Sequence, residues 1–165
     1  MQRCKGRRST CATERICDEN SDGHKKLNSM SNALYDLARE SFLSQNPAID
    51  WDTDNIKASL VRSSDYTPNM ATHQYLSSVP TRVADSANLG SKTVTAGVAD
   101  AADVTFTAVT AGAAIQYILI WKDTTVAGTS PLIALIDTAT GLPVTPNGGD
   151  ITIAWDNGAN KIFKL

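Results

Sequence analysis

The densest group of potential ligands in the sequence is the acidic segment Asp50-Trp51-Asp52-Thr53-Asp54. Its three carboxylates have the spacing of positions 1, 3 and 5 of a calcium-binding loop. Position 6 is Asn55, where such loops need glycine, and position 12 is Val61, where they place a bidentate glutamate. We therefore expect these aspartates to accept backbone hydrogen bonds in a loop with Trp51 packed underneath, and we predict no metal site.

The other candidates for chemistry are scattered along the chain. A glycosidase needs two carboxylates facing each other across a cleft, and nothing in the sequence brings a pair among Asp100, Asp103 and Asp137 together. His73 is the only histidine after residue 29, and we expect it on the polar face of a short helix over residues 71–77. The GxSxG, GxGxxG and P-loop patterns are missing from the sequence. We predict no enzymatic activity, no catalytic residue and no cofactor.

Three aromatic residues in the second half of the chain suit a sugar-binding surface, because flat rings stack on sugar faces. They are Tyr117, Trp121 and Trp155. Tyr117 and Trp121 are four positions apart in a predicted strand and therefore share a face, and Trp155 alternates in phase with Ile151 and Ile153. We favour packing in the core for these rings and keep a ligand surface as the alternative.

The composition fits one folded domain. The chain has 165 residues, of which 42% are hydrophobic and 19% charged, and its net charge is −2. A nucleic-acid or anionic-membrane binder normally has a surplus of basic residues. No apolar run approaches the roughly 18 residues that a membrane span needs. We therefore predict neither nucleic acid nor a membrane as a partner.

Residues 1–29 differ from the rest of the chain. They hold seven of the fifteen lysines and arginines and all three cysteines, and they have few aliphatic residues. The cysteines Cys4, Cys11 and Cys17 contain no CxxC pair, so zinc binding is a poor alternative, as is nucleic-acid binding by the basic residues. We predict a disordered basic extension, and we expect the natural product to begin at Met30.

From Met30 onward the hydrophobic pattern predicts one helix followed by strands. Apolar residues recur at helical spacing over residues 31–45, with Ser31 or Asn32 as the N-cap and Asn46-Pro47 as the stop. From Ile56 the period changes to two. The expected strands are 56–61, 92–95, 104–108, 114–122, 132–137, 142–145, 151–155 and 161–165.

Glycine, asparagine and proline turns separate these strands. Gly97 and residues 99–102 are expected to form turns, and Asp156-Asn157-Gly158 predicts a hairpin between the last two strands. The apolar segment 114–122 is expected at the centre of the sheet. The pattern predicts a mainly β fold: an antiparallel β-sandwich or partial barrel of about seven to eight strands with one N-terminal helix, in a single domain over residues 30–165.

Several segments of this domain resemble a group of small structural proteins of tailed bacteriophages. The resemblance rests on Met30–Phe42 (MSNALYDLARESF), on Asp52–Tyr66 (DTDNIKASLVRSSDY) and on Pro131–Leu165 (PLIALIDTATGLPVTPNGGDITIAWDNGANKIFKL), together with Thr67-Pro68-Asn69 and Thr72-His73. It covers nearly all of residues 30–165. Proteins of this group resemble head decoration or cement proteins, or tail and fibre accessory components.

The resemblance implies a non-enzymatic virion protein, and we expect a capsid decoration or cement protein on the outer head surface. The implied partners are the major capsid protein or tail proteins of the same virion, and a homo-oligomer, with a trimer favoured. The alternative is a tail, baseplate or fibre accessory protein, including a module that binds host glycan. Leu34, Leu37, Phe42 and Leu43 are the candidate oligomer or docking contacts, unless this helix packs on its own sheet.

Overall fold

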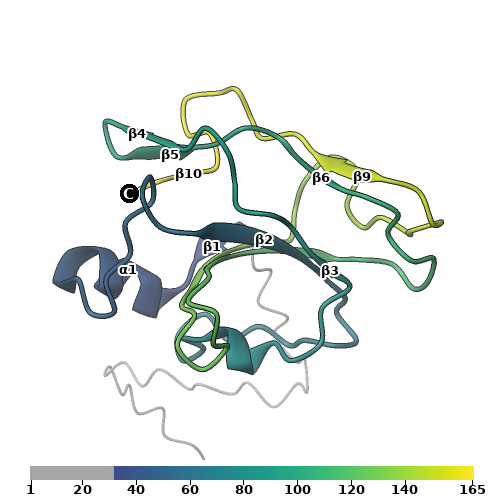
Figure 1. Ribbon diagram of the computed structural model, residues 1–165, viewed down its shortest axis with the longest axis horizontal. Helices are drawn as coiled ribbons and strands as arrows, with labels where there is room; N and C mark the ends of the chain where they lie inside the picture. Colours follow the sequence, from purple (N-terminus) through teal and green to yellow (C-terminus); the bar gives the residue numbers. More distant parts are fainter. Residues whose placement is uncertain (1–31) are drawn as a thin grey trace, which may run out of the picture.

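The structure is a computed structural model that describes residues 32–165. Figure 1 shows two β-layers stacked on each other, with one helix beside them and a layer of loops under the larger sheet. The predicted mainly β fold with one N-terminal helix is therefore confirmed. The predicted extension over residues 1–29, with its cysteines, and the cap at Ser31 lie outside the described residues.

The larger sheet has five antiparallel strands in the order β1-β8-β7-β2-β3. Their bounds are β1 Ala33–Leu34, β2 Ile56–Val61, β3 Ala84–Asp85, β7 Tyr117–Lys122 and β8 Leu132–Ile136. The apolar segment predicted at the centre does lie there, as β7 between β2 and β8. β-Branched and aromatic residues dominate this strand, and they suit a position between two neighbours.

β2 and β7 pair over six residues, from Ile56 opposite Lys122 to Val61 opposite Tyr117. Side chains on a strand alternate between the two faces, so Ala58 and Ile120 point to one face while Ser59 and Leu119 point to the other. All four are buried, and therefore both faces of the sheet are covered. Between β7 and β8 the register shifts at Ile120/Trp121, as in a β-bulge.

The second layer covers one face of this sheet (Figure 1). It consists of a three-stranded sheet, β10-β5-β4, and a two-stranded sheet, β6-β9. The bounds are β4 Thr93–Thr95, β5 Val98–Asp100, β6 Val104–Phe106, β9 Ile151–Ile153 and β10 Phe163–Lys164. β9 and β10 lie antiparallel to the same stretch of chain, because β9 pairs with β6 and β10 pairs with β5. The C-terminal strands therefore form one long edge of this layer.

Loops rather than strands cover the opposite face of the larger sheet. They are the segment around the 3-10 helix η1 (Leu76–Ser78) and the connection between β7 and β8, both seen below the sheet in Figure 1. The Leu76 N–H donates to the Ser130 carbonyl at 2.8 Å, and the Leu132 N–H donates to the Gln74 carbonyl at 2.8 Å. These bonds tie the two loops to each other and to the start of β8.

The helix is shorter at its start than the sequence predicts. α1 spans Asp36–Ser44, and its N-cap is Tyr35. Ala33 and Leu34, expected in the first helical turn, instead form β1 opposite Leu135 and Ala134 of β8. Tertiary pairing has thus overridden the helical spacing of this segment. The helix ends at Gln45, which has a left-handed φ of 58° and donates its N–H to the Ser41 carbonyl.

Four local predictions were also wrong. The predicted hairpin between the last strands does not form, because β10 pairs with β5 and not with β9. The predicted turn over 99–102 overlaps strand β5. The predicted helix over 71–77 is a turn followed by η1, and the predicted strand over 142–145 is reduced to one bridge between Ile115 and Val144.

No helix within residues 32–165 is long and apolar enough to cross a membrane.

We predict that Leu119→Ala lowers the free energy of unfolding by about 2–5 kcal/mol, because Leu119 is fully buried on the central strand β7. The control is Leu43→Ala, since the Leu43 side chain is 88% exposed and its replacement changes stability by less than about 0.5 kcal/mol. Urea unfolding followed by tryptophan fluorescence measures both. Equal midpoints for the two variants would contradict the assignment of β7 to the core.

Candidate functional site

The acidic segment forms the loop between α1 and β2 and is bonded into the fold. The Asp54 carboxylate accepts the Asp50 N–H at 2.7 Å and pairs with Lys122 at 2.8 Å, while the Lys92 ammonium donates to the Asp54 carbonyl. Trp51 is buried and donates its ring N–H to the Asp100 carbonyl at 3.0 Å. Within residues 32–165 no cluster of three or more potential ligands is placed to hold a metal ion.

The two exposed aspartates of this loop, Asp50 and Asp52, affect each other's acidity. The interaction of their side chains lowers the pKa of Asp50 and raises the pKa of Asp52. Each of the carboxylates weighed as a hydrolase pair has a different partner. Asp103 accepts the Trp155 N–H at 3.0 Å, Asp137 accepts the Thr138 hydroxyl at 2.9 Å, and Asp100 pairs with Lys161 at 3.4 Å.

His73 belongs to a hydrogen-bonded chain that sequence analysis did not find. The Tyr66 hydroxyl lies 2.8 Å from His73 Nδ1 and 2.9 Å from the Tyr35 hydroxyl. Tyr35 is fully buried and Tyr66 is 4% exposed. With His73 Nδ1 as the acceptor, Tyr66 donates to His73 and accepts from Tyr35, so both phenol protons are used. These hydrogen bonds connect Tyr35, at the start of α1, to the loop that carries His73 below the larger sheet.

Burial is the main cause of the shifted pKa values of the two tyrosines in this hydrogen-bonded series. It raises the pKa of Tyr35 far above the usual range, and the neighbouring Tyr66 adds to the shift. Burial also raises the pKa of Tyr66, while the hydrogen bonds that Tyr66 accepts from Tyr35 and from the Asn69 backbone offset part of the shift. Both phenols are therefore neutral, and their role is to stabilise the fold.

Trp121, one of the predicted ligand-surface candidates, is 4% exposed and anchors a second polar cluster. Its ring N–H donates to the Ser59 hydroxyl at 2.7 Å, and that hydroxyl donates to Asp85 at 2.6 Å. Arg82 donates two hydrogen bonds to Asp85, at 2.8 and 3.0 Å. The cations of Lys57 and Arg82 lie 5.8 and 5.9 Å from the Trp121 ring centroid.

The Asp85 carboxylate is the negative group that balances the cations of Arg82 and Lys57 in this cluster. Burial raises its pKa, but the hydrogen bonds from Arg82 and Ser59, with the charges of Arg82 and Lys57, outweigh burial and hold the pKa below its usual range. Asp85 is therefore ionised at neutral pH and fixes the indole ring through Ser59.

The other two aromatic candidates also serve the fold. Trp155 is 7% exposed and donates its ring N–H to the Ala102 carbonyl at 3.0 Å. Tyr117 is half-buried and packs against the core. Trp121 and Trp155 are therefore mainly core residues, in agreement with the preferred interpretation.

The four candidate docking residues are divided between the core and the surface. Leu34 is buried in β1, whereas Leu37 and Phe42 of α1 are half-buried and Leu43 is exposed. The Phe42 ring lies 6.1 Å from the Phe163 ring, which stands edge-on to Trp51 at 5.1 Å. α1 therefore packs partly on its own chain and leaves Leu43 as its fully exposed apolar side chain.

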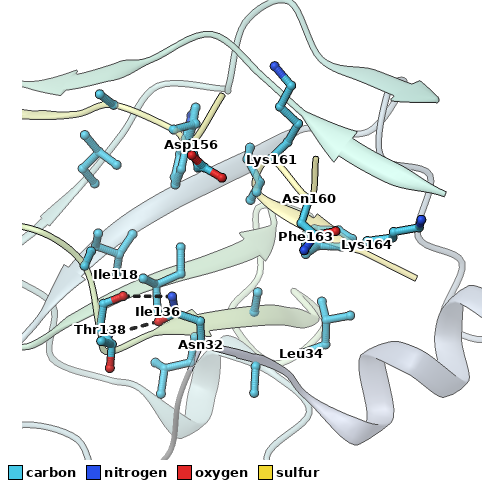
Figure 2. Close-up of a pocket in the computed structure, with 18 of the residues that line it drawn as sticks. Asn32, Leu34, Ile118, Ile136, Thr138, Asp156, Asn160, Lys161, Phe163 and Lys164 are labelled. Atoms are coloured by element: carbon cyan, nitrogen blue, oxygen red, sulfur yellow. Dashed lines mark hydrogen bonds between the residues drawn. The ribbon is translucent and has the colours of Figure 1, made fainter. Parts of the chain in front are cut away.

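A large hollow lies at the open side of the sandwich, and we call it the edge groove (Figure 2). Its volume is about 990 Å³. The side of the groove formed by the larger sheet and the side formed by the C-terminal segment are both apolar, and four charged residues also line it. The first side includes Leu34, Ile118, Ala134 and Ile136, the second includes Ile153, Trp155, Ile162 and Phe163, and the charged residues are Arg39, Asp156, Lys161 and Lys164.

β1 forms the edge of the larger sheet beside this groove. Tyr35 donates its N–H to the Ile133 carbonyl of β8 at 3.0 Å, so the alternation of an antiparallel pair turns the N–H and C=O of Leu34 away from β8. Asn32 fixes the strand end, because its side chain donates to the Thr138 carbonyl at 2.9 Å and accepts the N–H groups of Asp137 and Thr138. Figure 2 shows this clasp at the groove wall.

Sequence analysis missed the edge groove because its walls come from parts of the chain that are far apart in the sequence, including Asn32, Ile118 and Leu165. A smaller hollow of about 330 Å³ lies beside Trp51 and the acidic loop, and Phe163 and Leu165 line both hollows.

No protein-family model matches the chain, and no curated protein matches it either. The geometry of the chain's own residues is therefore the basis for the functional proposal.

We predict that Tyr66→Phe lowers the free energy of unfolding by about 1–3 kcal/mol, because it leaves the fully buried Tyr35 hydroxyl without its acceptor. The control is Tyr75→Phe, since the Tyr75 hydroxyl has no hydrogen-bond partner shown among residues 32–165. Equilibrium urea unfolding at pH 7 compares the two. A Tyr66→Phe protein as stable as the control would show that the hydroxyl chain is dispensable.

We predict that Asp85→Asn costs about 1 kcal/mol at pH 7, where partial solvent exposure screens the pairing with Arg82. Because the folded-state pKa of Asp85 is depressed, its stabilisation is present above the unfolded-state pKa of about 3.9 and is lost as the pH falls through the lower folded-state pKa. The difference between wild type and variant should therefore shrink below about pH 4. Unfolding curves over this pH range test it, and a constant difference would refute the pairing.

Proposed function

We propose that the protein is a non-enzymatic structural component of a tailed-phage virion, a decoration or cement protein that binds the outer surface of the head. The observation that carries the proposal is the edge groove: a rigid sandwich presents an open apolar groove next to an outward-facing strand edge. Strand edges and apolar grooves of this kind are used for protein–protein contacts. The resemblance of residues 30–165 to small tailed-phage structural proteins points to the same role.

The use of the reactive side chains supports adhesion rather than catalysis. His73 is held by Tyr66, Asp85 by Arg82 and Ser59, and Asp54 by Lys122, so each group has a structural partner. Polar groups whose hydrogen bonds are satisfied in this way hold the segments that they join in one arrangement. A rigid module that binds many equivalent sites gains avidity without new chemistry.

The proposed partner is the major capsid protein of the same virion, and the proposed arrangement is a homo-oligomer, with a trimer favoured. Symmetric oligomers present one surface several times, which matches the repeated sites on a capsid. The proposed location is the virion, after synthesis in the cytoplasm of the host bacterium.

The number of copies per particle separates a head decoration protein from a tail accessory protein. In purified virions, quantitative mass spectrometry should give a copy number comparable to that of the major capsid protein, because decoration follows the capsid lattice. A known tail protein measured in the same sample provides the low-copy reference. A copy number near that reference would place the chain in the tail, baseplate or fibre, and its absence from washed particles would overturn the virion role altogether.

A further inference from the structure

We propose that the edge groove binds an extended segment of the partner protein, which adds to β1 as a sixth strand of the larger sheet and carries a carboxylate on its groove-facing side. The inference deepens the proposed docking role by naming the surface and the chemistry of its partner. Three features of the groove carry it: a prepared strand edge, apolar walls and a positive rim.

The free edge of β1 has a fixed position because its opposite edge is hydrogen-bonded to β8. Backbone pairing with β8 leaves the N–H and C=O of Leu34 facing outward, which is the position where an added strand forms its first pair of hydrogen bonds. The Asn32 clasp on Thr138 fixes the start of β1 against the end of β8. A strand edge fixed in this way loses little conformational entropy when a segment binds.

The apolar walls determine which side chains the added strand must supply. Alternate residues of a strand point to one face, so every second side chain of a segment paired with β1 would enter the groove. There it would meet Ile136 of the larger sheet and Ile153 and Ile162 of the C-terminal segment, which are all half-buried. Covering them with valine or a similar side chain removes apolar surface from water and favours binding.

The charged rim determines the polar part of the segment. Residues 32–165 contain eight lysines and arginines and thirteen acidic residues, yet three of the eight bases and only one of the acids line the groove. Arg39 and Lys161 are paired with Asp36 and Asp100, whereas Lys164 has no ion-pair partner within residues 32–165. Lys164 thus places an uncompensated positive charge at the rim, and this charge favours a segment that brings a carboxylate toward it.

The test uses two synthetic peptides, acetyl-TVTETVT-amide and the same peptide with lysine in place of glutamate, and the full chain labelled with ¹⁵N. The glutamate peptide should shift the amide signals of Leu34 and Ile136 and slow hydrogen exchange at the Leu34 N–H, because that N–H becomes bonded to the peptide. The lysine peptide should bind about tenfold more weakly. No shift at millimolar peptide, or equal binding of both peptides, would overturn the proposal.

Lys164→Glu is the matching variant, since Lys164 is exposed and replacement leaves the core intact. It should weaken binding of the glutamate peptide about tenfold and strengthen binding of the lysine peptide. The control, Thr93→Glu with Thr95→Glu, makes the same change in net charge on β4 at the other edge of the layer, where both threonines are exposed. A similar loss in the control would assign the effect to overall charge and overturn the specific site.

Three further outcomes separate this inference from a self-association of the chain and from the docking role. If Leu34 and Ile136 shift with protein concentration when no peptide is present, a second copy of the chain occupies the groove and the proposed occupant is wrong. If the copy number per virion is far below that of the major capsid protein but the peptide binds as described, the strand-binding role of the groove is supported and the capsid role is refuted. If the copy number is comparable to that of the major capsid protein but the peptide leaves the Leu34 amide signal unchanged, the proposed strand binding in the groove is refuted and the capsid role remains supported.

Discussion

The six-residue antiparallel pairing of β2 with β7 is the constraint on which the rest of the structure depends. It fixes which side chains face the second layer and which face the loops, and a slip of one residue would exchange them. The register places Ser59 next to Trp121's indole N–H and sets Ile118 and Ile120 under the second layer. Both polar clusters and the edge groove follow from this pairing, since each is built on one face or one edge of the same sheet.

The polar clusters also explain why loops can cover a whole face of a sheet. A covering loop has backbone groups that must be bonded, and its position must be fixed by something other than a strand ladder. Here the chain from Tyr35 through Tyr66 to His73 holds one loop, and Arg82 with Asp85 holds the next. Polar side chains such as His73 and Asp85 thus fix the position of the covering loops, as a third layer of helices or strands would do in another fold.

Local patterns in the sequence predicted the parts of the fold that local physics controls. The alternation over β2 and the apolar run of β7 gave the central strands, and the mainly β class followed from them. The start of α1 and the partner of β10 were wrong because they depend on pairing with β8 and β5, far away in the chain. The edge groove was unpredictable for the same reason, whereas the core roles of Trp121 and Trp155 followed from strand phase alone.

Phe163 joins three parts of the molecule that lie far apart in the sequence. Its ring contacts Trp51 and lies near Phe42, while its backbone pairs with Ala99. The chain reaches it through residues 156–160, which are all exposed. One proteolytic cut in that loop would leave β10 attached through its two residue pairs with β5 and through the Phe163 ring, and the loss of β10 would uncover Trp51 and loosen α1. Resistance of this loop to proteolysis therefore helps to keep the second layer, the loop around Trp51 and α1 together.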